Sequence, residues 1–149
     1  MWPIIRSILA VIAGFVASNV IMLAIELINV VLYPDIVKAV ESKDPEALKA
    51  AIAEPGAIGA MFVVLVAWVL GSLAGGFVTG WIGRNAPVVH ALVVGGFLTL
   101  GGIANNLQYP PPVWFWIATF VAFIPAAYVG ARLAPTKTVQ PTSAAGAAA

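Results

Sequence analysis

Glu26 is an acidic residue inside a long hydrophobic stretch, and this setting makes it the best candidate for chemistry. The stretch, Ile4–Leu32, contains one other charged residue, Arg6, close to its start. In a helix, Asn19, Glu26 and Asn29 share one face, because successive residues turn by about 100°. A carboxylate there can hold a proton, a cation or a cationic head group. It can equally be structural, because hydrogen bonds between its carboxyl group and amide side chains would join two helices.

Further polar side chains are expected at the level of Glu26. Successive spans alternate in direction, so the end of the third hydrophobic stretch returns to the level where the first one ends. We expect the polar segment between the first two stretches to roof this region. The candidate ligand- or ion-binding residues are Glu26, Asn29, Asn105, Asn106 and Gln108.

Other kinds of chemistry lack the residues that they require. The chain has no cysteine and a single histidine, His90, which belongs at the opposite end of its span from Glu26. These residues supply no credible set of metal ligands and no paired acid and base for nucleophilic catalysis. The net charge of +1 indicates no nucleic-acid partner. We therefore predict a protein that is not an enzyme and uses no metal and no cofactor.

Four hydrophobic stretches supply the elements that must position the candidate residues. The chain is 62% hydrophobic and 9% charged, whereas soluble proteins are about 45–50% apolar and about 25% charged. Each stretch can cross a hydrocarbon core, which takes roughly 20 helical residues. The sequence predicts an all-α integral membrane protein with four transmembrane helices in an antiparallel bundle. The predicted spans are residues 4–32, 57–82, 88–107 and 113–133.

We expect residues 1–134 to form a single transmembrane domain. Residues 135–149 are rich in Pro, Thr and Ala and lack periodicity, which predicts a disordered C-terminal tail. The first loop should contain a short amphipathic helix that starts with Asp44 as N-cap and Pro45 at its first position. Its apolar residues Leu48, Ala51 and Ile52 fall on one face.

Small residues in the second and third stretches predict close helix packing, because membrane helices associate where their backbones can approach. The second stretch carries two small-xxx-small pairs on adjacent faces, so we expect it to pack against two neighbours. In the third stretch a narrow stripe of small residues ends at Asn106, and we expect it to contact the second or first helix. The predicted packing residues are Gly71, Gly75, Gly76, Gly80, Gly95 and Gly102.

Two runs of the sequence carry a resemblance. Residues 67–76 read Ala-Trp-Val-Leu-Gly-Ser-Leu-Ala-Gly-Gly, and residues 90–96 read His-Ala-Leu-Val-Val-Gly-Gly. Together with residues 102–105 they resemble small four-helix membrane proteins found across bacteria. The resemblance covers most of the chain up to Ala134. It implies a bacterial inner-membrane location and supplies neither an activity nor a site residue.

Two better-understood membrane families are similar in single features. Small multidrug-resistance exporters also have four spans and a functional carboxylate in the first. Glu26 is likewise a carboxylate in the first span, but it lies off-centre in that span, and the outer loop of this chain is long. Fluoride channels have a Gly-Ser step in a glycine-rich second span, as Gly71-Ser72 does, but their polar pore residues have no match here. No residue role is carried over from either family.

The charged residues also indicate an orientation. Arg6, Arg84, Arg132 and Lys137 lie on the side of the termini, and the first loop on the other side carries three Lys and five acidic residues, so the bias in Lys and Arg is slight. Loops rich in Lys and Arg stay in the cytoplasm. We therefore expect cytoplasmic N- and C-termini.

Two functional hypotheses follow. The first is a structural or accessory protein of the lipid bilayer that associates through its glycine-rich faces, as a homo-oligomer or with another membrane protein. The second is a small transporter or channel for a proton or a cationic solute that uses Glu26 and the nearby amides.

Overall fold

The computed structural model describes residues 2–135, and every regular element in that range is a helix. Four of the helices are long and apolar enough to cross a membrane, as the sequence predicts. The predicted C-terminal tail lies outside the described residues, except for Pro135. The helices are α1 (Trp2–Leu32), α2 (Pro34–Ser42), α3 (Pro45–Ala53), α4 (Ala57–Ile82), α5 (Pro87–Gln108) and α6 (Val113–Leu133).

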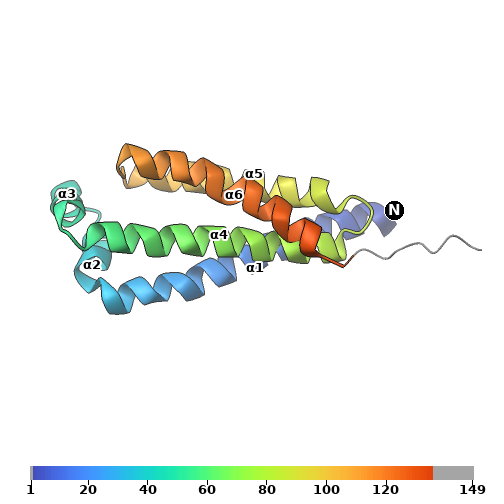
Figure 1. The fold of residues 1–149 in the computed structure, drawn as a ribbon, viewed down its shortest axis with the longest axis horizontal. Helices are drawn as coiled ribbons and strands as arrows, with labels where there is room; N and C mark the ends of the chain where they lie inside the picture. Colours follow the sequence, from blue (N-terminus) through green and yellow to red (C-terminus); the bar gives the residue numbers. More distant parts are fainter. Residues whose placement is uncertain (1, 136–149) are drawn as a thin grey trace, which may run out of the picture.

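The loop between the first two long helices contains two short helices, α2 and α3, which lie at one end of the molecule (Figure 1). The sequence analysis did not anticipate α2. Its signals are Pro34 at the first helical position and an acidic residue, Asp35, in the first turn, both of which favour a helix start. The helix ends where Lys43 adopts the left-handed conformation with φ 55°.

The helix α3 occupies the segment for which a loop helix was predicted. The Asp44 side chain accepts a hydrogen bond of 3.0 Å from the Glu46 backbone N–H, which satisfies one of the free donors of the first turn. Four apolar side chains of α3 are half-buried: the three expected ones, Leu48, Ala51 and Ile52, and Ala47.

The helix α4 packs closely against α1 through one glycine pair. A Cβ added at Gly71 would lie 2.8 Å from the Ser18 carbonyl oxygen, and one added at Gly75 would lie 2.6 Å from the Gly14 carbonyl oxygen. These distances are shorter than any ordinary carbon–oxygen contact. The two backbones therefore touch, as small-xxx-small pairs permit in membrane helices.

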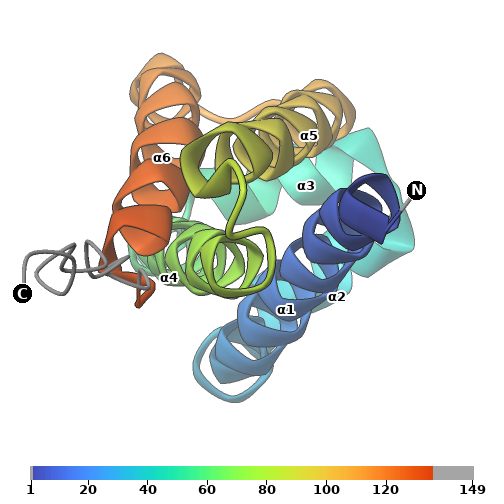
Figure 2. The same cartoon turned by 90° about the vertical axis from the view of Figure 1, so that its right-hand side faces the viewer.

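The other glycine pair of α4 faces α6. A Cβ added at Gly76 would lie 2.8 Å from the Ala127 Cα, and one added at Gly80 would lie 3.0 Å from the Ala131 Cα. In Figure 2 the helix α4 accordingly lies between α1 and α6.

The small-residue stripe of α5 contacts α6, so the expected contact with the second or first helix is wrong for its central residues. A Cβ added at Gly95 would lie 3.2 Å from the Ala127 Cβ, and one added at Gly102 would lie 3.0 Å from the Thr119 Cγ2. The physical reason is that both glycine faces of α4 are already occupied by α1 and α6.

An aromatic cluster fills the interior between α4 and α6. The Trp68 ring centroid lies 5.4 Å from that of Phe115 and 4.9 Å from that of Phe123, which are favourable aromatic separations. All three side chains are buried.

We expect Gly76→Ala to destabilise the fold by about 1–3 kcal/mol, because its methyl group would meet the rigid backbone of Ala127. The matched control is Gly96→Ala on α5, where an added Cβ meets nothing within 4 Å. Thermal unfolding of both variants in detergent measures the difference. Equal melting temperatures for Gly76→Ala and the wild type would show that α4 and α6 are not in backbone contact.

Candidate ligand-binding site

A cavity of about 390 Å³ lies at the end of the molecule that carries α2 and α3. We call it the outer cavity. The long helices α1, α4, α5 and α6 form its walls, and apolar residues of α2 and α3 line it as well. Four of the five candidate residues predicted from the sequence line it: Glu26, Asn29, Asn105 and Asn106.

Gln108 is the predicted candidate that the structure does not bring to the outer cavity. Its Nε2 donates a hydrogen bond of 2.7 Å to the Tyr109 hydroxyl, and it lines a neighbouring cavity beside the loop helices. Gln108 follows Asn106 by two positions, so a turn of about 100° per residue directs the two side chains to different sides of α5.

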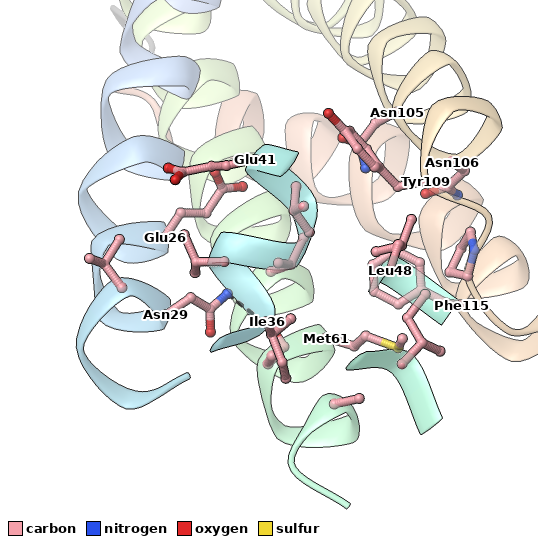
Figure 3. Close-up of a pocket in the computed structure, with 18 of the residues that line it drawn as sticks. Glu26, Asn29, Ile36, Glu41, Leu48, Met61, Asn105, Asn106, Tyr109 and Phe115 are labelled. Atoms are coloured by element: carbon pink, nitrogen blue, oxygen red, sulfur yellow. Dashed lines mark hydrogen bonds between the residues drawn. The ribbon is translucent and has the colours of Figure 1, made fainter. Parts of the chain in front are cut away.

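A second carboxylate, Glu41 of α2, also lines the outer cavity. In the view of Figure 3 it lies on the same side of the cavity as Glu26. Sequence reasoning missed it because α2 was not anticipated. The available signal is its position four residues after Val37, which lines the same cavity and shares a helix face with Glu41.

The carboxylate of Glu26 is half-buried, and the indole N–H of Trp68 is its side-chain hydrogen-bond donor. This contact joins α1 to α4. It also supplies the partner that a tryptophan indole requires when it is buried in a membrane span.

Asn29 presents a free acceptor. Its Nδ2 donates a hydrogen bond of 3.2 Å to the Ala60 carbonyl oxygen. Because a carbonyl can only accept, the amide nitrogen must face Ala60 and the Oδ1 atom must face away. The side chain is only 8% exposed, and its Oδ1 has no hydrogen-bond partner among the described residues.

Asn106 presents a second free acceptor, on the wall opposite Asn29 (Figure 3). The Thr119 hydroxyl donates to the Phe115 carbonyl oxygen at 2.8 Å, so it can only accept from Asn106. The Asn106 Nδ2 therefore donates to it, at 2.9 Å. The Asn106 Oδ1 is then left without a partner in the described structure, although the residue is fully buried.

The polar groups of the outer cavity are thus rich in acceptors. Glu26, Glu41 and the two asparagines whose buried amide oxygens lack partners line it, and no Lys, Arg or His is among the described residues of its lining. The remaining lining is mainly aliphatic and aromatic. Such a cavity suits a ligand that is positively charged, donates hydrogen bonds and has an apolar body.

His90 lines neither the outer cavity nor the other described cavities. In the described part of the chain, no group of three or more His, Asp or Glu side chains could hold a metal ion.

The fold and this site define an all-helical protein with four potential membrane spans and an acidic, acceptor-rich cavity at one end. No protein-family model, curated protein or solved structure matches the chain.

We expect Thr119→Val to destabilise the protein by about 1 kcal/mol, because it leaves the Asn106 Nδ2 buried without an acceptor. Thr119→Ser keeps the hydroxyl and is the control. Thermal unfolding in detergent compares the two variants. If both variants unfold at the same temperature, the hydrogen bond does not fix the orientation of the Asn106 amide.

Proposed function

We propose that this protein is a non-enzymatic, multi-pass membrane protein that binds an organic cation in the outer cavity, as part of a small transporter or channel. The observation that carries the proposal is the pair of buried amide oxygens without partners, on Asn29 and Asn106, two residues that line the same cavity as Glu26. A buried acceptor without a partner costs about 1–3 kcal/mol. A ligand that donates hydrogen bonds would recover this energy.

Charge and size support a cationic ligand of moderate size. Glu26 and Glu41 favour a positive charge, and the lining contains no basic side chain among the described residues that would oppose one. Trp68, Phe115 and Tyr109 supply aromatic faces, which attract organic cations. The volume of about 390 Å³ falls in the range of small-molecule sites, about 300–1,000 Å³.

The proposal places the four long helices in an antiparallel bundle across a bacterial inner membrane. The side of the termini carries four Lys and Arg residues and the first loop carries three, a slight excess that supports cytoplasmic N- and C-termini. The outer cavity would then face the outside of the cell. We propose that α3 acts as an amphipathic helix, with Leu48 and Ile52 turned toward the cavity that they line.

We expect Glu26→Gln to weaken binding of n-butylammonium, a cation with three N–H donors, by about tenfold or more, because it removes the negative charge of a half-buried carboxylate that would pair with the cation. The control is Glu46→Gln, an exposed acidic residue of α3 that lines none of the described cavities. Binding is measured by calorimetry on purified protein in nanodiscs.

Two results would contradict the proposal. If the wild type binds no alkylammonium ion, or if the two variants bind it equally well, the cavity is not a cation site. Glu26 would then be a structural group, and the hypothesis of an accessory protein would take precedence.

A further inference from the structure

A third cavity, of about 420 Å³, lies between α1 and α5 and adjoins the outer cavity. We call it the α1–α5 cleft. Four residues line both cavities, so the two meet at the carboxylate of Glu26. The shared residues are Leu23, Glu26, Trp68 and Asn105.

We propose that the α1–α5 cleft holds the hydrocarbon chain of a cationic amphiphile, whose head group lies at Glu26. The inference rests on the proposed function and names the ligand class of the same site: a molecule with one cationic head and one unbranched apolar chain, taken from the bilayer.

The lining of the cleft fits a hydrocarbon chain. Beyond Glu26 it is largely apolar and aromatic, with Met22, Phe97 and Phe123 among its residues. The amide of Asn19 already has a hydrogen-bond partner, because its Nδ2 donates to the Phe15 carbonyl oxygen of its own helix at 2.8 Å. It therefore does not require a polar ligand. The cleft therefore has a charged end at Glu26 and an apolar body.

The position of the cleft explains why the chain would come from lipid. Its α1 residues run from Phe15 to Glu26 and its α5 residues from Phe97 to Asn105. Both segments lie inside candidate membrane spans. Figure 2 shows α1 and α5 diverging on either side of α4. Phe15 of α1 and Phe97 of α5 line the cleft and are exposed. The cleft therefore opens toward the bilayer.

Gly101 of α5 is a position at which a side chain can be added at the cleft. It lines the cleft, and a Cβ added to it meets nothing within 4 Å. Gly96, on the same helix, has equally open space but lines none of the described cavities. Gly101→Leu and Gly96→Leu are therefore a matched pair.

The test measures binding of a series of n-alkylammonium ions, from methylammonium to the dodecyl compound, to both variants in nanodiscs. Longer chains partition more strongly into lipid, but partitioning changes the apparent affinities of both variants equally and cancels in the ratio of the two affinities. We expect the two variants to have equal affinities for methylammonium. For the dodecyl compound we expect Gly101→Leu to bind about tenfold more weakly, because the leucine occupies the space of the chain.

If Gly101→Leu and Gly96→Leu have nearly equal affinities at every chain length, and binding still depends on Glu26, the cleft proposal is overturned and the cation site is left intact. Absence of binding for all members of the series, in the wild type as well, would overturn the proposed function and this inference with it.

Discussion

The close contact of α4 with two neighbours is the constraint on which the rest of the structure depends. Lipid tails are as apolar as leucine, so burial of apolar side chains gives membrane helices little reason to associate, and backbone proximity has to supply the attraction. In α4 one glycine pair contacts α1 and the other contacts α6. This arrangement fixes α1 and α6 on different faces of α4 and leaves α5 to pack mainly on α6.

The cavities follow from this arrangement. Because α1 is held by α4, it is not drawn against α5 along its full length, and the space between them stays open near Glu26. The helices α2 and α3 cover the outer end of that space. Two of the asparagines that line this space already use their amide nitrogens as donors. The amide nitrogens of Asn29 and Asn106 are bound to Ala60 and Thr119, and only the oxygens are left free.

Hydrophobic length and proline positions made the long helices predictable, and the four expected spans correspond closely to α1, α4, α5 and α6. Alternation of the spans was enough to bring Glu26, Asn29, Asn105 and Asn106 to one level, and all four line one cavity.

The sequence did not give the correct position of residues whose placement is set by the rotation of a long helix or by the short helix α2. The stripe that contains Gly95 faces α6, because the two glycine faces of α4 are occupied by α1 and α6. Its spacing in the sequence does not say which neighbour it contacts. Gln108 is two positions past Asn106, and that rotation removes it from the cavity. Glu41 could not be assigned without α2, whose start depends on Pro34 in a segment that otherwise reads as a polar loop.

The most direct test of this account asks whether position 26 lies in a cavity that water can reach. The chain has no cysteine, so Glu26→Cys and Val20→Cys each introduce a single thiol. Val20 is also on α1, is 59% exposed and lines none of the described cavities. Each variant in proteoliposomes is treated with a membrane-impermeant trimethylammonium thiosulfonate, and modification is followed by mass. The account predicts rapid modification at position 26 and almost none at position 20. Equally slow modification at both positions would contradict it, because Glu26 would then face lipid or packed protein.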